Sequence, residues 1–217
     1  MIYNTYYWTI SVPLLLFYYV VHKTFPEIRD NKNHIYINYP SFINALITGI
    51  PSLYLLSEPN IVNYLSNTDP EVITYHYKIV PYMVYAYSIY DIYYGVSILD
   101  IPFIIHGLMS FVFLSIGIHY NSIHIALLAC IQENSSIFLN MRINKLMNLL
   151  FFLSFTYFRL YKFPLLVLEY IYSVPYDYNV YYLTLTGITV STSLNLYWYN
   201  KLLRIFFKEV NNYLKIE

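Results

Sequence analysis

Residues 85–142 decide the fold of this chain and read YAYSIYDIYYGVSILDIPFIIHGLMSFVFLSIGIHYNSIHIALLACIQENSSIFLNMR. Ionisable side chains stand here within or beside segments apolar enough to cross a bilayer: Asp91 lies in one run and His106 in the next, while Glu133 and Arg142 close the stretch. An ionisable side chain at membrane depth costs roughly 2.5–3.5 kcal/mol, so it normally faces a bundle interior or a polar cavity. The pattern predicts a functional site inside a helical membrane protein.

The composition supports the membrane class. The chain has 217 residues, of which 58% are hydrophobic and only 11% are charged, whereas a soluble domain carries about 25% charged residues. The formal net charge is zero, and no basic stripe precedes the C-terminal tail, so a nucleic-acid partner is not expected. The single cysteine, Cys130, excludes an internal disulfide and a cysteine-based zinc site.

Seven apolar runs approach the roughly 20 residues that a helix needs to cross a hydrocarbon core. They are residues 6–21, 41–56, 79–99, 101–118, 122–131, 146–164 and 180–203. The fifth run is short, and one strongly tilted helix over residues 102–132 is the alternative to a hairpin there. Gly117 and the polar residues 120–122 favour the hairpin. We therefore expect an all-α polytopic membrane bundle of about seven transmembrane helices, with six as the alternative.

Lysine and arginine placement predicts the orientation. With seven crossings, most basic residues fall on the side of the C-terminus, which the positive-inside rule assigns to the cytoplasm. The first run lacks a basic n-region and a small-residue cleavage site, so it is interpreted as a retained anchor and not as a signal peptide. We expect an anchor and cytoplasmic loop over 1–40, a membrane domain over 41–208 and a cytoplasmic tail over 209–217. The sequon at Asn134 would then be cytoplasmic and unglycosylated.

His106 and Asp91 are the strongest candidates for chemistry. His106 lies six residues after Asp100, and an imidazole at that depth can act as a base or nucleophile when a carboxylate orients it. The alternative is a polar side chain that bonds a neighbouring helix. Asp91 shares a helix face with Tyr87 and Tyr94, and the alternative for Asp91 is a structural partner of those hydroxyls or of Arg159.

Three further polar residues have competing interpretations. Arg159 is predicted either to pair with Asp91 or to snorkel to the interface. Glu133 is a cavity residue or a solvated one, and Asn195 is a ligand contact or a helix-packing residue. His119 and His124 are five apart, where i,i+4 suits joint metal ligation. We expect no metal and no cofactor, and no GxSxG, phosphate-loop or HExxH motif is present.

At this point the chain resembles the TLC-domain family, which includes ceramide synthases, translocon-associated membrane proteins and lipid-homeostasis proteins. The resemblance spans about residues 41–208 and is strongest to the smaller non-synthase members. Four places carry it: AYSIYD at 86–91, similar to the family's Gly-Tyr-x-x-x-Asp; DIPFIIH at 100–106, similar to an Asp, an apolar run and a histidine pair; ENSSIFLNMR at 133–142, similar to Glu-x-Ser-(Ser/Thr)-Pro-Phe-x-Asn-x-Arg; and the late helices with Arg159 and Asn195.

The resemblance implies helices around a lipid-sized cavity in an endomembrane, usually the endoplasmic reticulum. In ceramide synthases the histidine pair and nearby aspartates are taken as catalytic, and they transfer an acyl group from coenzyme A to a sphingoid amine. Here Gly107 replaces the second histidine and Ile137 stands in the place of the usual proline. Loss of one member of a catalytic pair commonly costs orders of magnitude in rate, so ceramide synthase activity is not expected.

The first hypothesis is a multi-pass TLC-type protein that binds or senses a sphingolipid, fatty acyl lipid or phospholipid and influences membrane lipid composition. The polar residues of its cavity would be Tyr87, Asp91, Glu133, Asn140, Arg142, Arg159 and Asn195. The alternative is an acyl-CoA-dependent N-acyltransferase with His106 as base or nucleophile and Asp100 orienting it. A small transporter or channel is a lesser alternative, because it needs helix breaks in corresponding halves and only Pro51 and Pro81 come near.

Overall fold

The computed structural model describes residues 2–25, 27–29, 35–67, 73, 76–120, 122–141, 144–173 and 178–214. The described chain is helical apart from one small antiparallel hairpin, which confirms the predicted all-α class. The elements in chain order are α1 Ile2–Thr24, β1 Ile28–Arg29, β2 Ile35–Ile37, α2 Tyr39–Asn44, η1 Ala45–Gly49, α3 Ile50–Leu55, α4 Ile61–Asn67, α5 His76–Ile98, α6 Ile101–His119, η2 Ile123–Ala126, α7 Leu127–Cys130, α8 Glu133–Leu139, α9 Lys145–Phe155, η3 Thr156–Lys162, α10 Phe163–Ser173 and α11 Tyr178–Leu214.

Two helical segments in the described part of the chain are long and apolar enough to cross a bilayer. They are α6 and the continuous segment Lys145–Ser173, which joins α9, η3 and α10. The helix α6 ends at His119, so residues 102–132 do not form the one long helix that was the alternative to a hairpin. The fifth predicted run is divided between η2 and α7, and α8 follows after a break. The count of seven crossings therefore stays a prediction.

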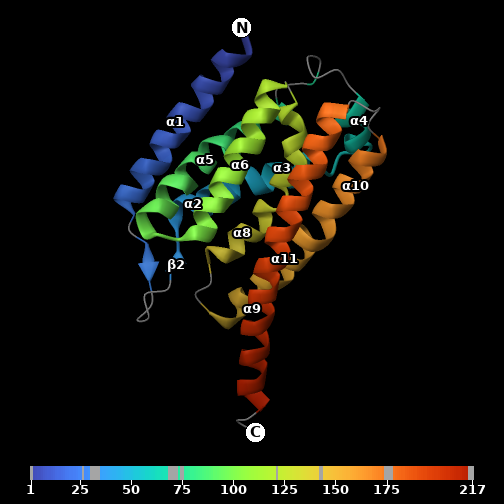
Figure 1. Cartoon of the computed structure of the whole chain (residues 1–217). Coiled ribbons are helices and arrows are strands. Elements are labelled where there is room, and N and C mark those ends of the chain that lie inside the picture. Colours follow the sequence, from blue (N-terminus) through green and yellow to red (C-terminus); the bar gives the residue numbers. More distant parts are fainter. Residues whose placement is uncertain are drawn as a thin grey trace.

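The helices α1, α5 and α6 lie side by side (Figure 1). The contact between α5 and α6 is close because glycine faces it from both helices. A Cβ atom on Gly95 would lie 2.9 Å from the backbone nitrogen of Ile104, and one on Gly107 would lie 2.9 Å from that of Ile92. Small residues let backbones approach in this way where helices pack within a membrane.

The joint between α5 and α6 is a tight turn with its own backbone chemistry. Leu99 adopts the left-handed region with φ of 55°, which is costly for a residue that has a Cβ atom. The amide of Asp100 donates to the carbonyl of Gly95 at 2.9 Å and so closes the end of α5. The Asp100 side chain then accepts from the amide of Phe103 at 3.2 Å and caps α6. A capping carboxylate at this position also favours the helix dipole.

The helix α1 is tied to the rest of the bundle by a buried tyrosine. Tyr18 is fully buried, and its hydroxyl donates to Oδ1 of Asn44 at 3.0 Å. The ring packs edge-on against Tyr87 on α5, with centroids 5.4 Å apart. Farther along α1, Nδ1 of His22 lies 3.1 Å from the hydroxyl of Tyr90. The N-terminal helix is therefore packed as part of the bundle.

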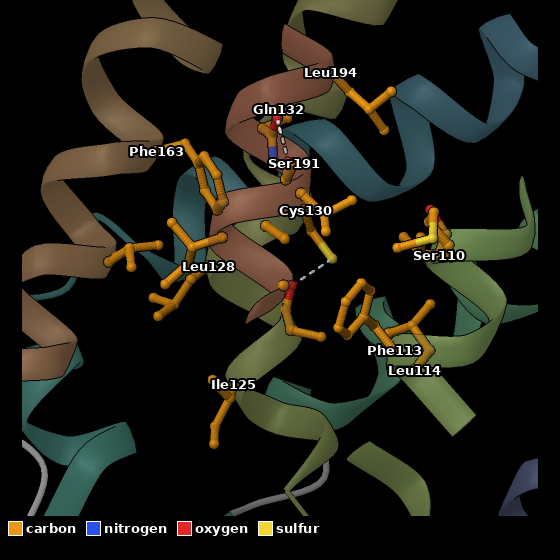
Figure 2. A pocket seen from close by; sticks show the side chains of 18 of the residues that line it. Ser110, Phe113, Leu114, Ile125, Leu128, Cys130, Gln132, Phe163, Ser191 and Leu194 are labelled. Carbon is orange, nitrogen blue, oxygen red and sulfur yellow. Dashed lines mark hydrogen bonds between the residues drawn. The ribbon is translucent and has the colours of Figure 1, made fainter. Parts of the chain in front are cut away.

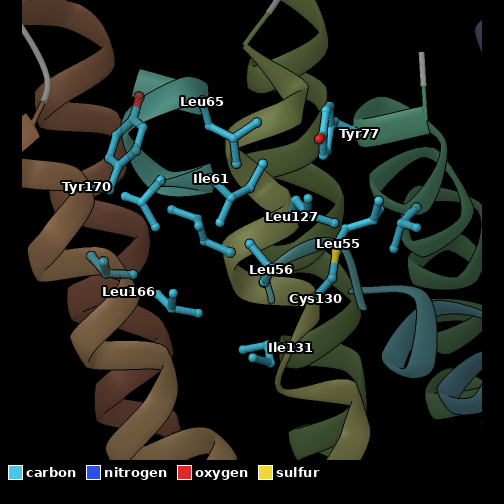
Figure 3. Packing of buried hydrophobic residues seen from close by; sticks show 14 of the residues in the cluster. Leu55, Leu56, Ile61, Leu65, Tyr77, Leu127, Cys130, Ile131, Leu166 and Tyr170 are labelled. Atoms are coloured by element: carbon cyan, nitrogen blue, oxygen red, sulfur yellow. The ribbon is translucent and has the colours of Figure 1, made fainter. Parts of the chain in front are cut away.

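The largest apolar core lies where α3, α4, α7 and α10 meet (Figure 3). Leu127 and Ile131 belong to it and are fully buried. The short helix α4 buries Ile61, Val62 and Leu65 in this core.

Two segments have the wider π-helical geometry, η1 and η3. Each ends two residues before a proline, at Pro51 and Pro164. A proline ring clashes with the carbonyl four residues earlier and provides no N–H for it, and a π segment relieves that conflict. Pro13 inside α1 has no such segment, so proline favours this geometry without requiring it.

The last helix, α11, is the longest, with 37 residues. Its C-terminal part projects away from the other helices (Figure 1). Stacked rings hold its middle to α9, with Phe152 lying 5.7 Å from Tyr199 and 4.9 Å from Phe206 between centroids. The N-terminal half of α11 faces α6, and both helices line a cavity.

Candidate functional site

A cavity of about 210 Å³ lies between α6, α11, the η2–α7 segment, η3 and α10 (Figure 2). Most of its wall is apolar. Phe113 and Leu114 contribute from α6, Leu128 from α7, and Phe163 and Val167 from α10. Polar side chains gather at one end, where the lining residues are His106, Gln132, Glu133, Arg159, Asn195 and Trp198. The volume is below the roughly 300–1,000 Å³ of sites that hold drug-sized ligands.

Arg159 is the centre of the polar end. It lies inside η3, is 7% exposed, and donates from Nε to Oγ of Ser135 at 2.7 Å. Nη2 donates to Oγ of Ser136 at 3.0 Å, and Nη1 to Oδ1 of Asn195 at 3.3 Å. The sequence interpretations expected Arg159 either to pair with Asp91 or to snorkel to the interface, and the guanidinium does neither. Instead it joins α8 and α11 through neutral acceptors.

Gln132 extends this network along α11. Its Oε1 accepts from Nδ2 of Asn195 at 2.6 Å, and its Nε2 donates to Oγ of Ser191 at 3.2 Å (Figure 2). Asn195 is 1% exposed, and its amide is used at both the oxygen and the nitrogen. Asn195 therefore joins its helix to neighbouring segments and also lines the cavity, so both interpretations of this residue apply.

His106 reaches the same end of the cavity from α6. Its Nδ1 lies 3.0 Å from Oδ2 of Asp91, whose side chain is 2% exposed while that of His106 is 28% exposed. An ionised carboxylate only accepts hydrogen bonds, so Nδ1 is the donor in this pair, and Nε2 is the ring nitrogen outside this contact. The imidazole is oriented, and its ring lies 5.8 Å from the ring of Trp198 on the cavity wall.

The carboxylate that holds His106 is not the one that the sequence suggested. Asp100 was expected to orient His106, but its side chain caps α6. Asp91 takes that position because α5 and α6 cross closely at Gly107, next to His106. The separation of fifteen residues between the partners follows from the tight turn after α5. Only Oδ2 of Asp91 has a partner, and Oδ1 is buried without one among the described residues.

The remaining predicted residues divide between the cavity and the packed interior. Glu133 is half-buried and lines the cavity. Tyr87 is buried away from the cavity lining, within electrostatic range of Asp91 and Glu133. Asn140 donates to Oγ of Ser41 at 2.9 Å and so joins α2 to the end of α8. Arg142 lies outside the described residues.

Gly107 stands where the resemblance places a second histidine, and the backbone of α5 lies close to it. A Cβ atom there would lie 2.9 Å from the backbone nitrogen of Ile92 and 3.0 Å from the carbonyl oxygen of Ser88. Real Cβ atoms essentially never approach backbone so closely. This helix crossing therefore has no room for any side chain at position 107.

Several members of the site were not singled out from the sequence. Ser135 and Ser136 were quoted within a motif without a role, and Gln132 and Ser191 were not considered. A sequence signal existed for two of them, because Gln132 directly precedes Glu133, and Ser191 lies four residues before Asn195 on the same helix face. No signal pointed to the approach of α8 to η3, since that contact joins segments more than twenty residues apart.

Comparison with known proteins gives one match. The model of the TLC domain matches residues 37–204. No curated protein and no solved structure gives a significant match. The match covers most of the chain, including α2 to α10 and the part of α11 that lines the cavity. With residues 86–91, 100–106 and 133–142 all inside it, the chain belongs to the TLC-domain family of membrane-associated proteins.

Proposed function

We propose that this protein holds a hydrocarbon chain of a membrane lipid in the cavity between α6 and α11. Through this bound lipid, the protein senses or influences membrane lipid composition. The observation that carries the proposal is that the cavity wall has an apolar part and a polar end. An apolar length along α6 and α11 ends in a polar group of Arg159, Gln132, His106 and Asn195. This division matches a lipid, which has an apolar chain and a polar head.

The dimensions agree with one chain. On α6 the lining extends from His106 to Gly117, about 16 Å at 1.5 Å per residue. Side chains of α6 and α11 approach each other at two places along this length: the rings of His106 and Trp198 at one end, and Phe113 beside Gly187 farther along. The chain would lie along this length of α6.

The test is lipid mass spectrometry on the full-length protein purified in a mild detergent. Ser110→Phe places a ring on the cavity wall of α6, whereas Val112→Phe places the same ring on the exposed face of the same helix. We expect a co-purifying lipid with the wild type and with Val112→Phe, and its loss with Ser110→Phe. Equal lipid content in both variants would mean that the lipid does not bind in this cavity.

A second candidate function rests on the contact of His106 with Asp91. An imidazole held by a buried carboxylate, with Nε2 free, is suited to general base chemistry. In an acyltransferase of the ceramide synthase type, it would take the proton from a sphingoid amine as nitrogen attacks the acyl carbonyl. The coenzyme A thiol would leave as the amide bond forms.

This candidate is tested with acyl-coenzyme A and a sphingoid base. We expect no N-acyl product above the level of His106→Ala, because Gly107 leaves one histidine at the site. Product from the wild type that is lost in His106→Ala and Asp91→Asn would establish the acyltransferase. Asp100→Asn is the control, since asparagine caps a helix as well as aspartate does.

A further inference from the structure

We infer that the lipid bound in this cavity has a single chain and an anionic head, a carboxylate or a phosphate monoester, and that Arg159 binds this head. The inference rests on the proposed lipid cavity and specifies the chemistry of its ligand. Its first support is the charge of Arg159. The guanidinium is 7% exposed, and in the described part of the chain no carboxylate oxygen lies within 4.0 Å of it. A buried charge is costly unless it is paired.

The second support is the geometry of the donors. The three neighbours that Arg159 binds, Ser135, Ser136 and Asn195, are all neutral. Because a guanidinium carries five N–H groups, both terminal nitrogens keep an N–H without a partner among these contacts. The planar arrangement of such donors fits the paired oxygens of a carboxylate or phosphate. The three bonds already made fix the guanidinium in place before a ligand arrives.

The third support is the position of Arg159 relative to His106. Both residues lie near Trp198, whose ring is 5.9 Å from Cζ of Arg159 and 5.8 Å from the His106 ring. A head bound to Arg159 is therefore next to the indole and within the end of the cavity that His106 lines. The chain then extends along the apolar wall toward Ile125 and Val167.

Glu133 is the opposing charge at this end. It lines the cavity and acts on Arg159 from beyond the distance of an ion pair. If the head is anionic, Glu133 repels it, and Glu133→Gln tightens binding. If the head carries an amine that contacts Glu133, the same substitution weakens binding. With oleate as the probe, tighter binding to Glu133→Gln is the result expected for an anionic head beside Glu133.

The experiment measures binding of radiolabelled oleate to the full-length protein in detergent, with three competitors of the same chain: oleate, lysophosphatidic acid and oleyl alcohol. We expect oleate to bind, and oleyl alcohol to compete at least about tenfold more weakly, as for loss of a charge-assisted hydrogen bond. Stronger competition by lysophosphatidic acid than by oleate assigns the head as a phosphate, and weaker competition assigns it as a carboxylate.

Arg159→Gln is expected to reduce oleate binding by about tenfold or more. The control, Arg204→Gln, changes an exposed arginine on α11 and is expected to leave oleate binding unaltered. Comparing the competitors on the wild type needs no variant, so the test stands even if Arg159→Gln does not fold. Equal competition by oleyl alcohol, or weaker oleate binding by Glu133→Gln, overturns the anionic head and leaves the lipid cavity intact. If none of the three compounds binds specifically, the proposed lipid cavity itself is overturned.

Discussion

At the scale of single residues, Gly107 shows how closely α5 and α6 approach each other. The family's histidine pair becomes His106 followed by glycine, and the helix crossing allows no Cβ at the second position. The remaining histidine is bound to Asp91 across the same crossing. Close approach of α5 and α6 thus removes one candidate catalytic group and orients the other.

Gly107→Ala is expected to lower the thermal midpoint of the purified protein, because the added carbon meets the backbone of Ile92 and Ser88. Overpacking of this kind costs about 1–3 kcal/mol. Gly187→Ala is the matched control, since its Cβ would lie 3.5 Å from the Phe113 ring, an ordinary contact. Thermal unfolding in detergent compares the two. Equal midpoints would mean that α5 and α6 are not in close contact at position 107.

Some residues of the site could be predicted from the sequence, whereas their hydrogen-bond partners could not. His106, Glu133, Arg159 and Asn195 are polar groups in apolar surroundings, and the structure brings all four to one cavity. Their partners were not predictable, because a hydrogen bond such as Arg159 to Ser135 depends on how two distant helices meet. Asp91 was chosen over Asp100 by the helix crossing, and spacing along the sequence had suggested Asp100.

At the scale of elements, the π segment η3 determines which way Arg159 points. It ends two residues before Pro164, and the wider turn rotates the residues upstream relative to an α-helix. Sequence patterns with a period of 3.6 residues cannot represent this change, so neither predicted direction for Arg159 agreed with its contacts. The apolar run itself was predicted well, because its hydrophobicity does not depend on the turn geometry.

The turn between α5 and α6 offers a test of backbone strain. Leu99 has a φ of 55° and is 84% exposed. The left-handed conformation costs roughly 1–2 kcal/mol for a residue with a Cβ atom, which exceeds the entropic cost of glycine, about 0.5–1 kcal/mol.

Leu99→Gly is therefore expected to raise the thermal midpoint slightly. Ser97→Gly, two residues earlier and inside α5, is expected to lower it, because there glycine loses helix propensity and the bond from Oγ of Ser97 to the carbonyl of Tyr94. Thermal unfolding of both variants beside the wild type gives the comparison. A fall of similar size in both would show that the turn after α5 is not left-handed.

The contact of α1 with the bundle is a second prediction at this scale. Tyr18→Phe removes the hydroxyl that donates to Asn44, and leaves Oδ1 of Asn44 buried without that donor. We expect a loss of about 1–3 kcal/mol, the cost of an unsatisfied buried group. Tyr19→Phe removes a hydroxyl from an exposed neighbour and is expected to be neutral. Unfolding midpoints that fall equally in both variants would contradict burial of the Tyr18 hydroxyl.

At the scale of the whole molecule, helical class and family membership followed from the sequence, whereas the number of crossings did not. Hydropathy identifies α6 and the segment Lys145–Ser173. The fifth predicted run became two short elements, because Ile123, Leu127 and Ile131 pack into cores and do not form one apolar rod. An apolar run of that length fits a core helix as well as a span.

The sequon at Asn134 is expected to carry no glycan, and the reason is independent of topology. Asn134 is 4% exposed, and its Nδ2, the atom that a glycan would occupy, donates to the carbonyls of Gly49 and Ile131. Glycosidase treatment followed by gel mobility checks this prediction. A mobility shift would mean that α8 does not pack against η1.

The central claim, that the cavity between α6 and α11 holds a lipid chain, is tested most directly by photolabelling. A fatty acid with a diazirine in its chain is added to membranes that contain the full-length protein, and the labelled peptides are mapped after irradiation. We predict label on the cavity wall at Phe113, Leu114 and Leu128. Label confined to the exposed face of α6, at Ile105, Leu108 and Val112, would contradict the account.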